Sequence, residues 1–391
     1  MADRKDIDFT YSLTDRVIRL SLGELADFSG AKYDGDFSLS LEQAQRRKDD
    51  YVAEQLGIGP GRRVLDLGCG WGGLLDYIRG RGGVGVGVTL SSAQVAACRR
   101  HGLDVHLQDA RRVDRARFGV FDAVASLGAF EHFCSPEAFE AGRQEEIYRD
   151  LFARVASLLP GSGRFYLQTM VFGRNMVDAD RIDMNALRAV PSRGSDAWHI
   201  ALLGRQFPGS WLPFGQEQVI RCAEPHFRLV SSISGRLDYI ETIRQWNARI
   251  GARSLRKTLL KLQLLPHWLT SADFRMAFTS GVSANKVCFE RELLDHYRLV
   301  FEKQGTASDG GGEQEANSCT TMGTGRADDP ATNVTPVQVT TVGLLSPKSE
   351  PCFRPATRIS LPAASDSLRA ESESVEDASY APVCRLAPPD S

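Results

Sequence analysis

Apolar and polar positions between residues 63 and 171 follow two alternating periods. Short runs rich in valine, leucine and phenylalanine predict strands, and apolar positions spaced three and four apart predict helices between them. The predicted strands are RVLDLG (63–68), VGVGVTL (84–90), DVHLQD (104–109), FDAVASLG (121–128) and GRFYLQTMV (163–171). The predicted helices include SSAQVAACRRHG (91–102) and EIYRDLFARVASLLP (146–160). This alternation predicts an α/β fold, with a mostly parallel sheet and helices on both of its faces.

Residues 1–60 predict a helical cap in front of the first strand. Apolar residues recur at helical spacing through LEQAQRRKDDYVAEQLGI (41–58), and the pattern ends at Gly59 and Pro60. A glycine followed by proline is a typical stop signal for a helix.

Downstream of the fifth strand, residues 175–215 break the rhythm with three prolines among aromatic residues. We interpret this segment as a lid or insertion over a pocket. A strand followed by a helix is predicted within residues 227–250, and the last helical pattern ends near LLDHYRLVFEK (293–303).

The composition changes beyond residue 304. Residues 304–391 hold nine of the seventeen prolines and only two aromatic residues, Phe353 and Tyr380. Such a segment buries too little apolar surface to offset its ordering entropy, so we predict a disordered tail. The predicted organisation is thus a cap (1–60), a main domain (61–303) with its lid, and the tail (304–391).

Composition narrows the class of protein. A formal net charge of −2 argues against a nucleic-acid partner bound through a basic surface. No apolar run is long enough to span a bilayer, and the first residues lack a secretion signal. The eight cysteines form no CxxC pair, so no metal site is predicted. We expect a cytoplasmic protein with reduced thiols.

Four glycines follow the first predicted strand within six positions, namely Gly68, Gly70, Gly72 and Gly73. A buried strand that enters a glycine loop and then a helix is typical of a site where a nucleotide-like ligand lies against backbone. The spacing differs from the G-x-G-x-x-G fingerprint for NAD, and Asp66 precedes the glycines. The alternative interpretation is a tight turn without a ligand.

The D-x-G-x-G pattern resembles motif I of the class I S-adenosylmethionine-dependent methyltransferases. Several further segments resemble one group among them, the cyclopropane-fatty-acyl-phospholipid synthases and mycolic-acid methyltransferases. These segments are YDGDFSLSLEQAQRRK (33–48), GVTLSSAQ (87–94), FDAVASLGAFEHF (121–133), RQFPGSWLP (205–213) and RLDYIETIRQW (236–246). The resemblance covers about residues 10–303. It implies a Rossmann-like, mostly parallel seven-stranded sheet and S-adenosyl-L-methionine as cofactor.

The resemblance also implies a set of site residues. The residues that would line the cofactor are Phe28, Ser29, Asp66, Gly68, Gly70, Thr89, Leu90 and Gln94, with Asp109 near the adenine amine. Trp71 would pack against the cofactor or against the start of the following helix.

The implied chemistry is methyl transfer to an alkene carbon of an unsaturated acyl chain, which leaves positive charge and a proton to remove. The family holds a bicarbonate base with a cysteine, a glutamate, a histidine and a tyrosine. Glu131 and Tyr239 match two of these, whereas Gly30 stands at the cysteine and Gln168 at the histidine. Because Gln168 cannot carry charge, bicarbonate binding and cyclopropanation are both open. His132 is a further candidate base.

Three functions remain open at this point. The first is a lipid-biosynthetic methyltransferase that acts on unsaturated acyl chains of phospholipids, by cyclopropanation or by C-methylation at the double bond. The second is an N- or C-methyltransferase of a soluble amine or secondary metabolite, and the third a non-catalytic cofactor-binding protein.

A basic amphipathic helix predicted within 253–269, with Arg253, Lys257 and Lys261 on one face, suggests peripheral contact with the inner membrane face. The alternative interpretation is a core-packed helix whose basic face is solvated.

Overall fold

The computed structural model describes residues 19–22, 26–189, 192–207, 209–270 and 285–305. Residues 1–18 of the predicted cap and residues 306–391 of the predicted tail lie outside these described ranges.

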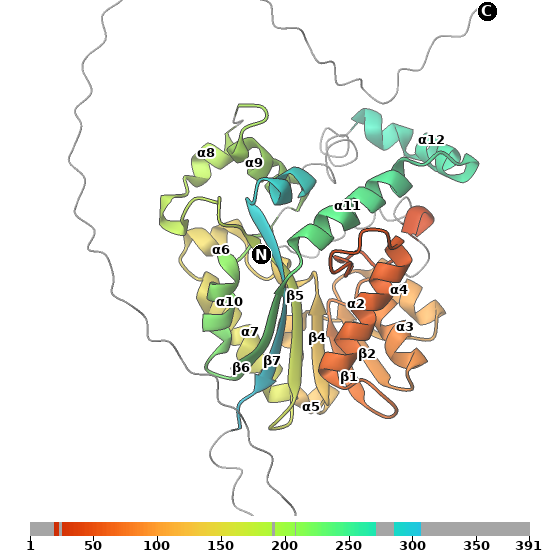
Figure 1. Ribbon diagram of the computed structural model, residues 1–391, viewed down its shortest axis with the longest axis vertical. Coiled ribbons are helices and arrows are strands. Elements are labelled where there is room, and N and C mark those ends of the chain that lie inside the picture. Colours follow the sequence, from red (N-terminus) through yellow and green to blue (C-terminus); the bar gives the residue numbers. More distant parts are fainter. Residues whose placement is uncertain (1–18, 23–25, 190–191, 208, 271–284, 306–391) are drawn as a thin grey trace, which may run out of the picture. The chain divides into compact units, whose positions relative to one another are not determined.

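A seven-stranded sheet forms the centre of the domain (Figure 1). Its strands are β1 (Arg63–Leu67), β2 (Val84–Thr89), β3 (Asp104–Leu107), β4 (Ala123–Leu127), β5 (Arg164–Phe172), β6 (Phe227–Ser234) and β7 (Leu294–Lys303). Their order is β3-β2-β1-β4-β5-β7-β6. Strands β1 to β5 are parallel, and β7 runs antiparallel to both of its neighbours. The predicted fold class is therefore confirmed, and the five predicted strands agree with β1 to β5 within two residues at either end.

One element was predicted wrongly. Residues 293–303 read as the end of a helical pattern, yet they form β7, which is paired on both sides. Leu299, Val300 and Phe301 are fully buried in this strand. His296 and Arg298 are buried polar residues that interrupt the apolar positions before this run, so the two-residue period of a strand is not visible in the sequence.

Helices cover both faces of the sheet (Figure 1). Those before β5 are α2 (Leu41–Leu56), α3 (Gly73–Gly80), α4 (Ser92–Arg100), α5 (Arg115–Phe118), α6 (Pro136–Glu140) and α7 (Gln144–Leu158). Those after it are α8 (Met184–Arg188), α9 (Asp196–Gln206), α10 (Gly215–Ala223), α11 (Arg236–Gly251) and α12 (Leu255–Thr270). Short 3₁₀ turns are η1 (Ala110–Arg112), η2 (Phe130–His132) and η3 (Ala179–Arg181). In β5, Phe165 and Leu167 join one apolar core and Tyr166 joins the other, as the two-residue period of a strand requires.

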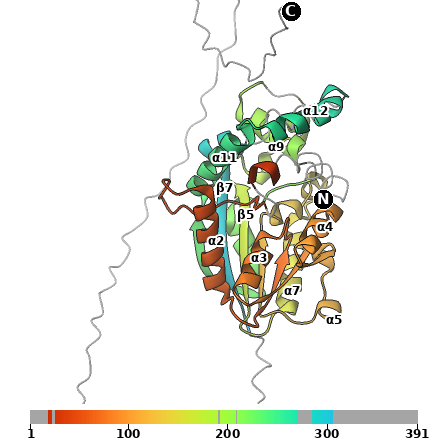
Figure 2. The ribbon, with the colours of Figure 1, turned by 90° about the vertical axis from the view of Figure 1, so that its right-hand side faces the viewer.

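Helix α2 places the described part of the cap against the sheet, as Figure 2 shows. Ser40 and Gln43 form a capping box at its start. The helix ends at Leu56, earlier than the predicted stop at Gly59, because Gly57 adopts a left-handed conformation with φ of 62°.

The predicted insertion connects β5 to α10 and contains η3, α8 and α9. Its last part packs tightly, since Trp211 stacks on Phe139 and meets Phe172 edge-on. Ser210 lies beside His132, with 2.7 Å between the serine Oγ and the imidazole Nδ1. That this segment acts as a lid stays a prediction.

The helix predicted within 253–269 is present as α12, but the predicted basic face is wrong at Lys257. Lys257 is buried, and its ammonium donates to the backbone carbonyls of Arg249 and Ala252. Leu255, Leu259 and Leu262 are instead exposed, at 77%, 53% and 59%. Within the described ranges, no helix is both long and apolar enough to cross a bilayer.

Candidate cofactor pocket and adjoining acceptor site

A pocket opens where four adjacent parallel strands end. Gly68 follows β1, Thr89 ends β2, Asp109 follows β3 and Gly128 follows β4, and all four line the pocket. The nine residues predicted to bind the cofactor all line this one cavity. Ligands of α/β sheets bind outside the carboxyl ends of the strands, so the position is the expected one.

The glycine loop serves two purposes. Gly68, Gly70 and Gly72 all have positive φ, at 89°, 53° and 86°. A Cβ on Gly68 would stand 2.3 Å from the Cβ of Ala129, and one on Gly72 would stand 2.6 Å from Leu103. A Cβ on Gly70 would meet nothing within 4 Å. Packing within the chain therefore requires Gly68 and Gly72, whereas Gly70 leaves open space for a ligand.

Alanine at two of these glycines should separate folding from ligand binding. We expect Gly68→Ala to lower the free energy of unfolding by at least about 2 kcal/mol, through backbone strain and overpacking. Gly70→Ala should cost about 1 kcal/mol of stability and act mainly on ligand affinity. Thermal melts and ligand titrations of the two variants check this. Equal destabilisation by both would contradict the distinction.

Asp66 is a buried carboxylate at the floor of the pocket, 3% exposed. Among the described residues, its Oδ1 has no hydrogen-bond partner. Burial raises its pKa to about 7. An unpaired buried oxygen is costly, so its position facing the pocket fits a ligand that donates a hydrogen bond.

Lys48 is a site residue that the sequence interpretation missed. It is 1% exposed, lines the pocket, forms an ion pair with Asp27 and donates to Ser29 Oγ at 3.0 Å. The sequence does carry a signal for a buried Lys48, because this residue follows Leu41 and Ala44 at the helical spacing of the buried face of α2. A charged residue on such a face is unusual unless it is paired.

Phe28 and Ser29, in the loop before α2, form part of the pocket wall. Phe28 stacks on Trp246 of α11 with ring centroids 4.3 Å apart. Ser29 Oγ donates to Asp27 Oδ1 at 2.6 Å. Trp71 also lines the pocket and packs with Ala26 and Ala97, so it contributes to both pocket and core.

At the end of β2, Thr89 and Gln94 support each other. The Thr89 hydroxyl donates to Gln94 Oε1 at 2.6 Å, and both side chains are buried. Ser91 caps α4 by accepting from the Gln94 amide, which fixes the start of that helix. Leu90 completes this part of the pocket wall.

Asp109 lines the pocket but is already engaged. Its Oδ1 accepts from the backbone amide and Nε of Arg111, both at 2.9 Å, and its Oδ2 pairs with the same guanidinium. Arg111 and Gln108 line the pocket as well, and sequence reasoning missed both. Direct recognition of an adenine amine by Asp109 stays a prediction.

Glu131 and His132 lie together in η2, next to the pocket. Glu131 is 3% exposed, and its Oε1 accepts from the Met170 amide at 2.7 Å. Its Oε2 has no partner among the described residues, and burial raises its pKa to about 7. His132 lines the pocket itself, and burial lowers its pKa to about 4. Its imidazole is therefore neutral at pH 7.

Gln168 and Tyr239 lie beside Gly30 and not in the pocket wall. Both ends of the Gln168 amide are used, since Nε2 donates to Gly30 O at 3.0 Å and Oε1 accepts from Tyr166 at 3.1 Å. Tyr239 stacks on His296 with ring centroids 4.8 Å apart. Gln168 thus holds the Gly30 loop against β5, and its role toward a bound anion stays a prediction.

The comparisons with known proteins agree with this geometry. The cyclopropane-fatty-acyl-phospholipid synthase of Escherichia coli (strain K12) is 30% identical over 274 residues, which cover 68% of this chain and 59% of that protein. The chain thus spans about three fifths of that relative. Hydroxymycolate synthase MmaA4 of Mycobacterium tuberculosis (strain ATCC 25618 / H37Rv) is 29% identical over 309 residues, which cover 78% and 94%.

A solved structure supports the fold. The mycolic acid cyclopropane synthase CmaA1, complexed with SAH and CTAB, matches with a TM-score of 0.59 and 23% identity, covering 77% of this chain and 98% of that one. The family model for mycolic acid cyclopropane synthetase matches residues 1–268. The chain therefore belongs to the mycolic acid cyclopropane synthetase family, as the sequence motifs predicted.

Proposed function

We propose that this protein is an S-adenosyl-L-methionine-dependent methyltransferase that modifies unsaturated acyl chains of phospholipids. The modification is cyclopropanation or C-methylation at the double bond. The observation that carries the proposal is the pocket at the strand ends, with the buried carboxylate of Asp66 in its lining and a second buried carboxylate, Glu131, beside it.

The pocket residues fit the cofactor. Asp66 offers an unpaired acceptor oxygen to its ammonium or hydroxyl groups, and Gly70 leaves room for close approach to the backbone. Lys48 and Ser29 lie at the same end and suit a carboxylate. When bound, this cofactor supplies an electrophilic methyl group. The CmaA1 structure of the same fold was determined with SAH, its demethylated form.

The surroundings of Glu131 and His132 suit an apolar methyl acceptor on which positive charge develops. Phe130 and Phe133 flank the Glu131 and His132 pair, and both are buried. Ionised Glu131 in such surroundings stabilises a nearby positive charge far more than a carboxylate in water does. His132 is neutral at pH 7 and adds no repulsion.

The second proposed feature is peripheral contact with a membrane through α12. Exposed leucines recur along this helix, together with exposed Lys261 and Arg256. Apolar and basic side chains on one exposed helix suit an anionic lipid surface. Through this contact the enzyme would reach acyl chains that reside in a bilayer.

Vesicle binding tests this surface. We expect Leu259→Ser/Leu262→Ser to weaken co-sedimentation with anionic phospholipid vesicles at least about tenfold, since two apolar side chains no longer leave water. The matched control is Val230→Ser, an exposed apolar residue of β6, which should bind like the unaltered chain. Equal binding by the double variant would remove α12 from the membrane contact.

Lipid analysis tests the function itself. Phospholipids from cells that express the protein should gain the mass of one methylene on monounsaturated chains. An unchanged lipid profile, with cofactor consumed in the presence of a soluble amine, would favour the alternative acceptor class. For methylation of a soluble amine, His132 is the favoured base because it lines the pocket. Cofactor binding without any turnover would support the non-catalytic alternative.

A further inference from the structure

The space beside Gly30 is filled by a histidine from a distant part of the chain. A Cβ on Gly30 would stand 3.1 Å from Cε1 and 3.2 Å from Nε2 of His296, and 2.8 Å from Cδ2 of Tyr239. Gly30 directly follows Phe28 and Ser29, which line the cofactor pocket. The imidazole of His296 and the ring of Tyr239 thus border the position that a side chain at residue 30 would take, next to that pocket.

Strand pairing places His296 opposite Met170, the residue that binds Glu131. In the antiparallel ladder of β5 and β7, His296 lies opposite Met170, and Arg298 lies opposite Gln168. Residues opposite each other point to the same face of a sheet. Gln168 and Arg298 reach the carbonyls of Gly30 and Ala31 on that face. The amide of Met170 is also the donor to Glu131 Oε1.

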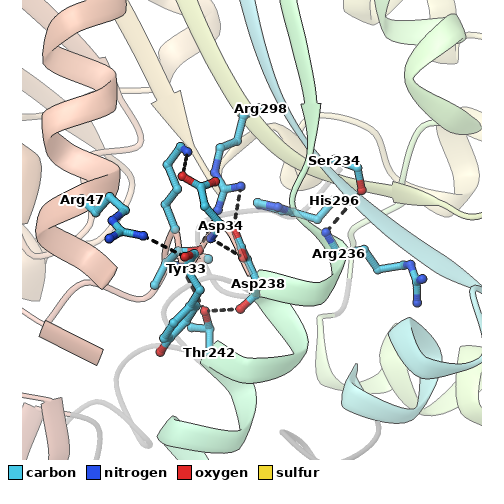
Figure 3. Close-up of polar contacts among 12 residues, drawn as sticks. Tyr33, Asp34, Arg47, Ser234, Arg236, Asp238, Thr242, His296 and Arg298 are labelled. Carbon is cyan, nitrogen blue, oxygen red and sulfur yellow. Dashed lines mark hydrogen bonds and ion pairs between the residues drawn. The ribbon is translucent and has the colours of Figure 1, made fainter. Parts of the chain in front are cut away.

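His296 is held in place but keeps hydrogen-bonding capacity. It is 2% exposed, stacks on Tyr239, and has an Nδ1 without a partner among the described residues. Figure 3 shows it beside Arg298 and Asp238 of α11, whose ion pair measures 3.0 Å. Gly235 leaves room for both, because a Cβ there would stand 2.5 Å from His296 Nδ1 and 2.6 Å from Arg298.

The charges around His296 keep it neutral. Burial lowers its pKa well below the ordinary value, and the positive charges of Arg298 and Lys48 act in the same direction. Asp238 forms an ion pair with Arg298. Glu131 accepts from the amide of Met170, the residue opposite His296 in the β5–β7 ladder. A neutral imidazole near a cationic reaction centre is an available proton acceptor and does not repel the centre.

We propose that His296 is the catalytic proton acceptor of this methyltransferase and takes the place of an external anion held by residues 30 and 168. This inference rests on the proposed function. Glu131 then serves as the buried anion, and His296 serves as the base.

The step balances in electrons and protons. The π pair of the alkene forms the new bond to the methyl carbon, and the pair of the broken sulfur–carbon bond stays on sulfur. For a ring, a C–H bond of the transferred methyl group then breaks, and its electron pair closes the ring onto the cationic carbon. For a methyl branch, a C–H bond on a carbon next to the cationic carbon breaks, and its electron pair forms a new double bond. In either case the proton goes to Nε2 of His296, which becomes an imidazolium. Such a proton is strongly acidic, so a weak base is sufficient.

The test uses the full chain, S-adenosylmethionine and vesicles of monounsaturated phosphatidylglycerol, in buffer with and without bicarbonate. We expect His296→Gln to lower kcat by about 10²–10⁴-fold, with KM and cofactor affinity changed by less than about threefold. Imidazole added to His296→Ala should restore part of the rate, which a purely structural role would not allow. The unaltered enzyme should be indifferent to bicarbonate.

Controls separate the possible failures. The control variant is His226→Gln. His226 directly precedes the start of β6, and this variant should behave like the unaltered enzyme. If His296→Gln does not fold, Gly30→Ala applies a second test, because its Cβ crowds both the imidazole of His296 and the ring of Tyr239. Lost turnover with retained cofactor binding is expected. Full activity in either variant, or dependence of the unaltered enzyme on bicarbonate, overturns the assignment of His296. An unaltered enzyme that binds cofactor but leaves the lipid unchanged overturns the lipid function, and the assignment with it.

Discussion

Glu131→Gln is expected to lower kcat by about 10²–10³-fold while cofactor affinity stays unchanged. The amide keeps the shape and can still accept from the Met170 amide, but it carries no negative charge. Loss of one preorganised electrostatic group in a dry site typically has an effect of this size. Steady-state kinetics with unsaturated phospholipid vesicles measures it. Glu137→Gln, an exposed glutamate of α6, is the matched control and should retain full activity.

The pH dependence of the same variant has a defined sign. Burial raises the pKa of Glu131 to about 7 from the ordinary 4.5, and the ionised form is the active one. At saturating cofactor, the kcat of the unaltered enzyme should therefore rise with pH through about 7, and this rise should vanish in Glu131→Gln. Because the folded-state pKa is raised, this group lowers stability progressively as pH rises from 4.5 through about 7.

Stability gives an independent readout. Relative to the unaltered chain, Glu131→Gln should gain up to about 3 kcal/mol between pH 4.5 and pH 8, from the change in pKa. Thermal melts at several pH values measure the difference. A variant that keeps its rate, or whose relative stability does not change with pH, would contradict a buried and ionisable Glu131.

Asp66→Asn is expected to raise the Kd for S-adenosylmethionine about 10–100-fold. A hydrogen bond to a charged partner contributes about 1.5–3 kcal/mol, and asparagine removes the charge while it keeps the volume. Affinity of the unaltered chain should also increase as pH rises through about 7, where Asp66 ionises. Isothermal titration calorimetry measures both effects.

The control for this variant lies on the same segment. Asp76 of α3 is half-exposed, forms an ion pair with Arg79 and does not line the pocket. Asp76→Asn should bind the cofactor like the unaltered chain. If Asp66→Asn also does so, the carboxylate on the pocket floor has no role in binding.

The sequence carried enough information for most of the fold. Strands β1 to β5 were predictable because their apolar runs are bounded by turn signals, and strand–helix alternation fixes the parallel arrangement. Strand β7 was not, since His296 and Arg298 interrupt a run that is buried by neighbours on both sides. Its pairing with β5 joins residues more than a hundred positions apart, which local periodicity cannot reveal.

The candidate site divides in the same way. The glycine loop, Thr89 and Gln94 were identified because they belong to contiguous motifs. His296 lies in no motif, and it reaches Gly30 only through the register of β5 and β7. Asp109 was predicted from the family resemblance, whereas its interaction with Arg111 is visible only in the structure. Likewise, the prediction of a basic face on α12 placed Lys257 in solvent, whereas its ammonium donates to backbone carbonyls.

The most direct measurement follows a labelled methyl group from S-adenosylmethionine to vesicles of monounsaturated phospholipid, with the purified full chain as catalyst. Label in the acyl chains, at a rate reduced in Asp66→Asn and Glu131→Gln, is the predicted result. Cofactor that binds tightly while the label never enters the acyl fraction would contradict the account.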